Sequence, residues 1–443
     1  QFAANRQAEA GQVMQTRQRH LCYFMHFTEE AEPRLWSGQD ETEWLDRIEC
    51  EHDNLRAALD WALSGGEFLQ GMRIVGALWD FWMDRGYARE GQVQAERFLA
   101  RPDAARDTFA QARVLYTAGT LAFYGGRFAA APPFLLESIA LSRQLGIDGK
   151  RILALALVGR GHMLLSFEEL DATEMTAIEC LHLGQELHDT LFQAQALLQL
   201  ASVARLRGES TGARQYFLDC IECVKSHGAR AMHGTALFNY GRLLYEQGDY
   251  AAAHAYVTRS LIIYEEMDDS VRRSIALRQL GVMAMAQGDY AEAQAFLNQA
   301  LKLVRHVGQL RQLNDVLDVM GRLALQQRDY ARANALLQES FGLAVEVNHL
   351  PWIARALEAL ACLAAAQGQM EPAARLFGAA ETHGVAVETR LDPVWCASHE
   401  QWLAAARIQL EEPTFSASWD LGAAMELDQA LDYAGRTSTY ARG

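Results

Sequence analysis

The stretch ALFNYGRLLYEQGDYAAA at residues 236–253 is followed, 40 positions later, by ALRQLGVMAMAQGDYAEA at residues 276–293. Both stretches have Gly at the sixth position, the tripeptide Gly-Asp-Tyr seven positions later, and Ala at the end. A fixed period of this length is the sequence signature of a repeat protein. The repeat therefore predicts how most of the chain is organised.

The turn between the two halves of the repeat recurs along the chain. At intervals of 40 residues, with one interval of 42, the turn position holds Gly86, Gly126, Glu168, Gly208, Gly248, Gly288, Arg328 and Gly368. Six of these eight residues are glycine, which readily adopts the left-handed conformation that ends a helix. The frame predicts eight units, and the two-residue insertion predicts that the third unit is the most irregular.

Each unit is predicted to be a pair of antiparallel helices. In the first helix, apolar residues recur at i, i+3, i+4 and i+7, as in Leu277, Leu280, Gly281 and Ala284, which form one helix face. The third member of this pattern is Gly or Ala in seven units, so the partner helix can approach closely there. The second helix has a small residue, such as Ala293, with a larger one four positions later, and small surfaces that face large ones interlock.

These patterns predict an all-α fold, a right-handed α-solenoid of eight helical hairpins with helical flanks. We expect an N-terminal helical linker or cap over residues 1–66, the eight repeats over 67–386 and a C-terminal helical cap over 387–443. Pro393 is expected in the first turn of a helix within that cap. The composition agrees, because the 443 residues include only 8 Pro and half of them are hydrophobic. A non-repetitive helical bundle is the alternative.

The repeat resembles the tetratricopeptide repeat (TPR) in its small first-helix residue, its Gly-Asp-Tyr turn and its second-helix Ala. A unit of 40 residues is similar to the longer form of this repeat found in bacterial regulators such as the maltose-regulon activator. Helices that are extended by about one turn account for the difference in length.

Five further motifs extend the resemblance. RHLCYF at 19–24, EHDNLRAALDW at 51–61, LFGAAE at 376–381, ASW at 417–419 and LDQALDYA at 427–434 are similar to the C-terminal sensor half of bacterial signal-transduction ATPases with numerous domains (STAND), including LuxR-type and antibiotic-pathway regulators. The resemblance implies a parent protein in which a nucleotide-binding module precedes residue 1. It also implies an effector, such as a DNA-binding helix-turn-helix, and a role in transcriptional control.

Charge and composition exclude several partners. The net charge is -16, and only Lys150, Lys225 and Lys302 are lysines, so direct binding to nucleic acid or to an anionic membrane is not expected. No apolar run approaches the ~20 residues that a membrane helix requires. The start at Gln1 lacks a signal peptide, and the absence of an initial Met indicates a fragment or a processed product. The odd set of 7 cysteines favours reduced thiols in a cytoplasmic protein.

Motifs for catalysis or cofactor binding are not found in the sequence. The loop at 146–151 has neither the spacing nor the hydroxyl of a phosphate-binding loop, and no metalloprotease or serine-hydrolase motif occurs. We therefore expect no enzyme activity, no cofactor and no metal. Cys220 and Cys223, with His227 and His233, could bind zinc. The favoured interpretation is packing, because Cys220 occupies a small-residue position that Ser or Ala fills in other units.

The first helices are expected to line the inner, concave face of the solenoid. Candidate ligand-binding residues are the polar and aromatic residues beside the apolar stripe of these helices. They are Tyr116, Phe123, Tyr124, His162, Gln199, Arg205, Asn239, Arg242, Tyr245, Arg278, Gln279 and Arg322, with Asp318 nearby. Arginine suits carboxylate or phosphate groups, and tyrosine adds contact area. Ordinary solvated helix faces are the alternative.

Two functions follow from these observations. The first is a non-catalytic sensor whose groove binds a peptide, a protein or a small-molecule inducer and shifts the parent ATPase between a closed monomer and an active assembly. The second is a protein–protein assembly scaffold without an inducer. A chaperone C-terminus is not an expected partner, because Leu198 and Ser202 stand where the two-carboxylate clamp of chaperone-binding TPR domains would need Lys and Asn.

Overall fold

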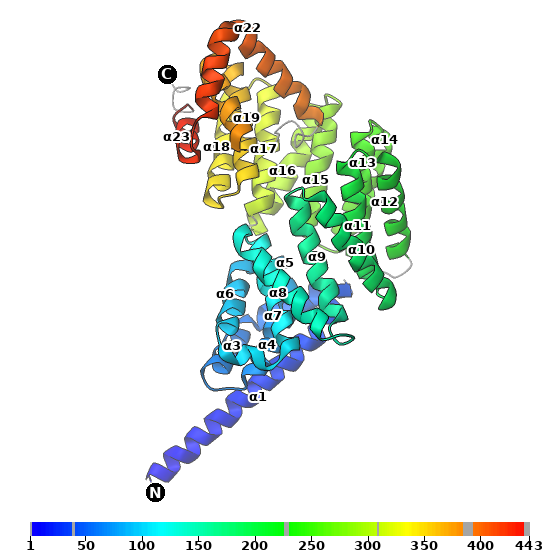
Figure 1. Ribbon diagram of the computed structural model, residues 1–443, viewed down its shortest axis with the longest axis vertical. Helices are drawn as coiled ribbons and strands as arrows, with labels where there is room; N and C mark the ends of the chain where they lie inside the picture. Colours follow the sequence, from blue (N-terminus) through cyan, green and yellow to red (C-terminus); the bar gives the residue numbers. More distant parts are fainter. Residues whose placement is uncertain (1, 38–39, 226–229, 308–309, 384–392, 438–443) are drawn as a thin grey trace. The chain divides into compact units, whose positions relative to one another are not determined.

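A computed structural model describes residues 2–37, 40–225, 230–307, 310–383 and 393–437. Over these residues every regular element is a helix, as the repeat pattern predicts (Figure 1). The chain divides into two compact units, residues 1–243 and 244–443, and the boundary lies within α13 (Arg230–Glu246). The predicted all-α solenoid is confirmed as rows of packed helical hairpins.

Unit 1 begins with three flanking helices. They are α1 (Phe2–Ser37), α2 (Glu41–Cys50) and α3 (His52–Ser64). The long α1 contacts both α2 and α3, and Leu21, Ile48 and Leu55 from these helices are almost completely buried. Leu21 lies in the RHLCYF motif and Leu55 in the EHDNLRAALDW motif. Both motifs therefore contribute to a core that covers the first hairpin.

The hairpins of unit 1 follow in chain order. They are α4 (Phe68–Ala77), α5 (Trp79–Asp84), α6 (Ala88–Leu99), η1 (Pro102–Arg106), α7 (Thr108–Tyr124), η2 (Phe128–Ala130), α8 (Ala131–Gln144), α9 (Lys150–Ser166), α10 (Leu170–Glu186), α11 (Thr190–Leu206) and α12 (Ser210–Lys225). The first helices α7, α9 and α11 contact one another along one side of the row. Residues that project from this side can therefore form one surface.

The third unit is regular, so the prediction that it would be the most irregular is wrong. Its helices, α9 and α10, each span 17 residues, and the insertion lies in the turn before α9, where Gly146 has φ 61°. The irregularities occur earlier in the chain. The first helix of the first unit is interrupted at Leu78, and the second helix of the second unit is preceded by η2 and has Pro in its first turn.

Unit 2 continues the same alternation. Its helices are α14 (Tyr250–Glu266), α15 (Ser270–Ala286), α16 (Tyr290–Val307), α17 (Leu310–Gln326), α18 (Tyr330–Glu346), α19 (Leu350–Ala366), α20 (Met370–His383), α22 (Pro393–Ala423) and α23 (Leu427–Thr437). Helix α22 starts at Pro393 as expected, packs on α19 and α20, and has non-helical dihedral angles at Glu411. None of the described helices is both long and apolar enough to cross a bilayer.

The Gly-Asp-Tyr turn has a simple structural basis. All eight predicted turn positions have positive φ, including the two that are not glycine, Glu168 (58°) and Arg328 (61°). The next residue is the N-cap of the second helix in three of the clearest units. Asp249, Asp289 and Asp329 each accept a hydrogen bond from the backbone N–H three positions later. One residue ends the first helix and its neighbour starts the second.

The small-residue positions allow the paired helices to approach closely. A Cβ atom on Gly321 would lie 2.6 Å from Leu337, and one on Gly119 would lie 2.7 Å from Leu135. The small residues of the second helices are also buried, and four of them donate a hydrogen bond to a first-helix carbonyl 26 positions earlier. These four are Ser138, Cys180, Cys220 and Ser340. Cys220 therefore packs as Ser138 and Ser340 do, which agrees with the favoured interpretation. His227 of the alternative zinc site lies outside the described residues.

Candidate ligand-binding site

Charged side chains connect two consecutive first helices of unit 2, α17 and α19, next to α15. Helices α15 and α17 are in contact, as are α17 and α19. Between the last two, Arg355 pairs with Asp315 (Nη2–Oδ1, 2.6 Å) and Asp318 (Nε–Oδ2, 3.4 Å). Arg322 pairs with Asp318 (Nε–Oδ1, 3.2 Å) and with Glu358 (Nη2–Oε2, 2.7 Å). We call these five residues the charge network.

The charge network runs from the protein surface into the core. The side chains of Asp315 and Arg355 are 24% and 31% exposed, whereas that of Arg322 is 4% exposed and that of Glu358 is 0% exposed. Charges in the core require partners, because an isolated buried charge loses its hydration without compensation. Here each buried charge has an opposite charge within hydrogen-bonding distance. A change at the exposed end of the charge network can therefore affect its buried end.

The electrostatic environment keeps Glu358 and Arg322 ionised. Burial raises the pKa of Glu358, but the Arg322 charge and the hydrogen bond from His399 outweigh burial and lower the pKa to about 2. For Arg322, burial lowers the pKa, but Asp318 and Glu358 outweigh it and raise the pKa. Both groups are therefore charged throughout the neutral range.

Two further arginines act electrostatically on the more accessible end of the charge network. Burial raises the pKa of Asp315, but the positive charges of Arg355, Arg278 and Arg311 outweigh burial and hold it below its usual value. Arg278 lies half-buried on α15, and Arg311 is exposed in the first turn of α17. The charges of three arginines, from three consecutive first helices, thus act on one carboxylate. This point of a strongly acidic chain carries an excess of positive charge.

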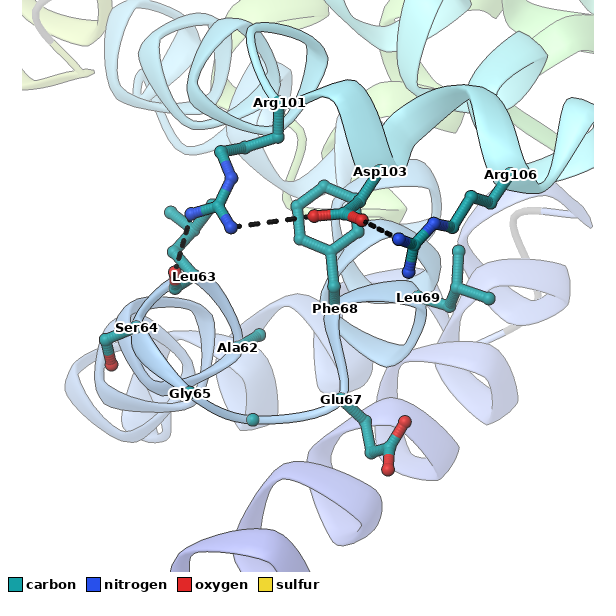
Figure 2. Close-up of a pocket in the computed structure, with 11 residues that line it drawn as sticks. Ala62, Leu63, Ser64, Gly65, Glu67, Phe68, Leu69, Arg101, Asp103 and Arg106 are labelled. Carbon is teal, nitrogen blue, oxygen red and sulfur yellow. Dashed lines mark hydrogen bonds and ion pairs between the residues drawn. The ribbon is translucent and has the colours of Figure 1, made fainter.

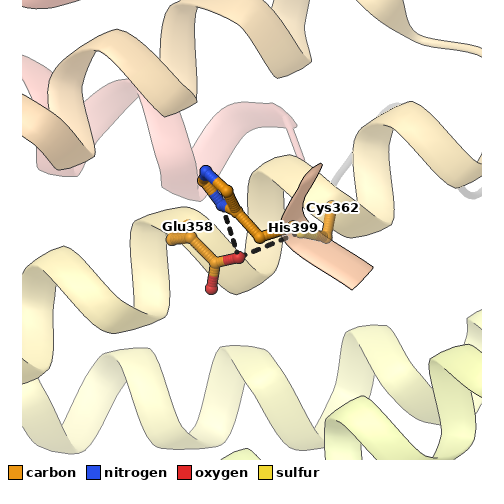
Figure 3. Close-up of side chains that lie close together, drawn as sticks. All are labelled: Glu358, Cys362 and His399. Atoms are coloured by element: carbon orange, nitrogen blue, oxygen red, sulfur yellow. Dashed lines mark hydrogen bonds and ion pairs between the residues drawn. The ribbon is translucent and has the colours of Figure 1, made fainter. Parts of the chain in front are cut away.

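Helix α22 contacts the buried end of the charge network through a histidine. Oε1 of Glu358 lies 3.1 Å from Sγ of Cys362 and 3.1 Å from Nδ1 of His399, and both interactions converge on this one oxygen (Figure 3). All three side chains are buried, and the indole ring of Trp395, also on α22, lies against the Arg322 guanidinium. The C-terminal cap is therefore connected to the charge network.

In unit 1 the structure brings two of the predicted residues together. The hydroxyl of Tyr124, at the end of α7, lies 3.1 Å from Nδ1 of His162 on α9. Arg205, Asn239 and Arg242 are half-buried on α11 and α13. Asn239 donates its side-chain N–H to the carbonyl of Thr235 on its own helix. These side chains remain partly accessible to a ligand on the first-helix side of unit 1.

Six of the twelve predicted residues are buried. They are Tyr116, Phe123, Gln199, Tyr245, Gln279 and Arg322. Their contacts are internal: Tyr116 packs edge-on against Trp79, Gln199 donates to the carbonyl of Val158, and Tyr245 packs against Tyr250. In this structure these side chains pack within the protein and stabilise the first helices. The accessible part of the predicted surface consists of Tyr124, His162, Arg205, Asn239, Arg242 and Arg278.

A separate cavity of about 400 Å³ lies in unit 1, between the α3–α4 turn and η1 (Figure 2). Its two arginines are already engaged. Arg101 donates to the carbonyl of Leu63 at 3.1 Å, and Asp103 pairs with Arg101 at 3.5 Å and with Arg106 at 2.9 Å. The cavity contains none of the predicted ligand-binding residues.

The sequence analysis did not identify Asp315, Arg311 or Arg355 as site residues. It also did not identify the cluster of Glu358, Cys362 and His399. A signal was present in α19, where Glu358 interrupts an otherwise apolar helix face next to Leu357. A charged residue within a core stripe requires a buried partner. The identity of that partner depends on which residue of the neighbouring helix faces it, and the repeat frame does not specify this.

Comparison with known proteins supports the repeat assignment. Residues 192–266 and 272–344 match the model of the tetratricopeptide repeat family. No curated protein matches the chain significantly.

Solved structures show a similar fold at low sequence identity. A Rap protein complexed with Competence and Sporulation Factor is 14% identical, with a TM-score of 0.52, over 76% of this chain and 96% of that one. The apo form of the quorum sensor NprR from B. thuringiensis is 11% identical, with a TM-score of 0.52, over 81% and 97%. A STAND protein with a tetratricopeptide repeat sensor from Pyrococcus horikoshii is 13% identical, with a TM-score of 0.46, over 82% and 55%.

Proposed function

We propose that this chain is a non-catalytic binding module that recognises an acidic peptide or protein segment on its first-helix surface. One observation carries the proposal. The positive charges of Arg278, Arg311 and Arg355, from three consecutive first helices, all act on the carboxylate of Asp315 in a chain of net charge -16. Arginine binds carboxylates through two parallel hydrogen bonds, so a ligand carboxylate suits this position.

Binding at this point can be transmitted within unit 2. A ligand carboxylate competes with Asp315 for Arg355, which also contacts Asp318. Asp318 shares Arg322 with Glu358. A displacement of Asp315 therefore changes the interactions of the buried groups that contact α22. Moving a two-state equilibrium from 1:99 to 99:1 requires about 5.5 kcal/mol of differential binding, and contacts from several helices can supply this amount.

The fold similarity supports a sensor role. The solved Rap protein is complexed with a Competence and Sporulation Factor, and NprR is described as a quorum sensor. The motif resemblance to STAND proteins further supports a parent protein with an N-terminal nucleotide-binding module, a cytoplasmic location and a role in bacterial transcriptional control. An assembly scaffold without an inducer is the second candidate, supported by the repeat fold itself.

In the test, peptides that bind the chain are selected from a displayed library. The affinity of the selected peptides for the chain is then measured by calorimetry. We expect the selected peptides to be acidic. Replacing Arg278 and Arg311 together by Ala should weaken binding by about 10- to 100-fold, the cost of losing charge-assisted hydrogen bonds. Arg259→Ala, which removes one arginine at an exposed position on the second helix α14, is the control and should bind as the native chain does.

The proposal fails if the selected peptides have no acidic preference, or if the double replacement and the control bind equally well. The two candidate functions are separated by size-exclusion chromatography with and without peptide. A sensor is expected to be monomeric and to change its hydrodynamic radius with peptide. A scaffold is expected to self-associate or to retain a protein partner.

A further inference from the structure

Three side chains in unit 2 form a cluster of metal-binding atoms. Sγ of Cys362, Nδ1 of His399 and a carboxylate oxygen of Glu358 all lie within 4.8 Å of one another, and all three residues are buried. Both shorter separations, Sγ–Oε1 and Nδ1–Oε1, are 3.1 Å (Figure 3). None of these residues is among the three arginines to which the acidic ligand is assigned.

The arrangement of the three residues is suited to a metal ion. Glu358 and Cys362 are four positions apart on α19, so both side chains project from the same face of the helix. His399 comes from α22 and approaches from the other side. In tetrahedral zinc sites, bond lengths of ~2.0 Å to N or O and ~2.3 Å to S place neighbouring ligand atoms roughly 3.3 to 3.5 Å apart. The Sγ–Oε1 and Nδ1–Oε1 separations need to increase by only a few tenths of an ångström.

The surroundings fix the orientation of the ligand atoms. Arg322 holds the other carboxylate oxygen, Oε2 of Glu358, at 2.7 Å, which leaves Oε1 directed at Cys362 and His399. The ring of Phe377 packs edge-on against His399, with ring centroids 5.1 Å apart. Outer contacts that orient ligands, together with an apolar shell, are typical of protein metal sites.

We propose that Glu358, Cys362 and His399 bind one Zn²⁺ ion through Oε1, Sγ and Nδ1. On binding, the Cys362 thiol releases its proton to solvent, and a neutral imidazole carries its single proton on Nε2. Sulfur, nitrogen and oxygen together suit zinc better than they suit calcium or magnesium, which prefer oxygen alone. The ion links α19 of the last hairpin to α22 of the cap, so it stabilises the C-terminal end of unit 2.

The test uses the full chain after treatment with a chelator. Co²⁺ serves as a spectroscopic probe because a cobalt–thiolate bond gives a charge-transfer absorption in the near ultraviolet. We expect saturation at one Co²⁺ per chain, displacement of cobalt by Zn²⁺ and a rise in Tm with either ion. Cys362→Ser and His399→Gln should each remove or strongly reduce this absorption and weaken Zn²⁺ binding by more than about 100-fold.

The matched control is Cys220→Ser on the second helix α12. Cys220 is buried, as Cys362 is, and its replacement should retain the native spectrum. The proposal is overturned if the native chain gives no cobalt–thiolate absorption, which requires no variant to fold. It is also overturned if Cys362→Ser keeps the absorption, or if Cys220→Ser loses it, because the metal would then belong to the Cys220 and Cys223 pair. None of these measurements involves a peptide, so the outcome is independent of the proposed function.

Discussion

Arg322 of α17 and Glu358 of α19 form an ion pair of 2.7 Å in which both side chains are almost completely buried. Each also has a second partner, since Arg322 pairs with Asp318 and Glu358 accepts from His399. A pair of this kind does not by itself make a protein more stable than an apolar pair would. Removing one member is costly, however, because the other charge remains buried without compensation.

Arg322→Leu should therefore lower the free energy of unfolding by about 3 to 5 kcal/mol. The substitution leaves two buried carboxylates without the arginine between them. Asp318 then keeps its ion pair with Arg355, and Glu358 keeps its contact with His399. The measurement is urea unfolding at neutral pH in the presence of a chelator. Arg143→Leu removes an exposed pair with Glu179 and should cost no more than about 1 kcal/mol. Equal losses in the two variants would contradict the buried pairing.

Acid should destabilise the chain through Glu358. Its pKa is about 2 in the folded state, below its ordinary value of 4.5, so the unfolded chain takes up the proton first as the pH falls. The ionised Glu358 carboxylate contributes about 3 kcal/mol to the free energy of unfolding. This contribution is fully present above about pH 5 and is lost as the pH falls toward 2. Urea unfolding between pH 6 and pH 3 measures it. Glu358→Gln should flatten this dependence relative to the native chain, whereas Glu339→Gln at an exposed pair should not.

Arg328→Gly should stabilise unit 2 by about 1 kcal/mol. Arg328 occupies the turn between α17 and α18 with φ 61°, a conformation that costs an L-residue roughly 1–2 kcal/mol and costs glycine very little. The opposite change, Gly288→Arg at the equivalent turn with φ 80°, should destabilise by a similar amount. Thermal unfolding of both variants checks the sign. Changes in the same direction would mean that the turn conformation does not control stability.

Gly321 and Gly342 should respond in opposite directions to alanine. A Cβ atom at Gly321 would lie 2.6 Å from Leu337, so Gly321→Ala should cost about 1 to 3 kcal/mol by overpacking. Gly342, in the middle of α18, has nothing within 4 Å of its Cβ position. Gly342→Ala should therefore gain up to about 1 kcal/mol from helix propensity. Denaturant unfolding of the two variants tests the close approach of α17 and α18.

The repeat frame predicted the helices because each depends on residues close in sequence. The 40-residue period identifies the turn residues, the small residues of the first helices and the buried small residues of the second helices. Even Glu168 and Arg328, which are not glycine, adopt the turn conformation. The break at Leu78 was not predicted, because the apolar pattern continues through it.

The candidate site was predicted only in part. Arg278 was identified from its place beside the apolar stripe, and Tyr124 and His162 lie together as members of one face. The frame fixes which side of a helix a residue occupies but not the depth to which a neighbouring helix covers it. Residues such as Gln199 and Gln279 were therefore taken as accessible although they are buried.

Each hairpin turn is closed by hydrogen bonds that stay within about ten residues of chain. At the turn around Gly248, the N–H of Asp249 donates to the carbonyl of Leu244 and its carboxylate accepts from Ala252. Such a closure does not depend on the hairpins further along the chain. Duplication or deletion of whole 40-residue modules preserves every turn, whereas a gain or loss of a few residues inside a helix shifts its apolar face. The evolution of array length should accordingly proceed in whole modules.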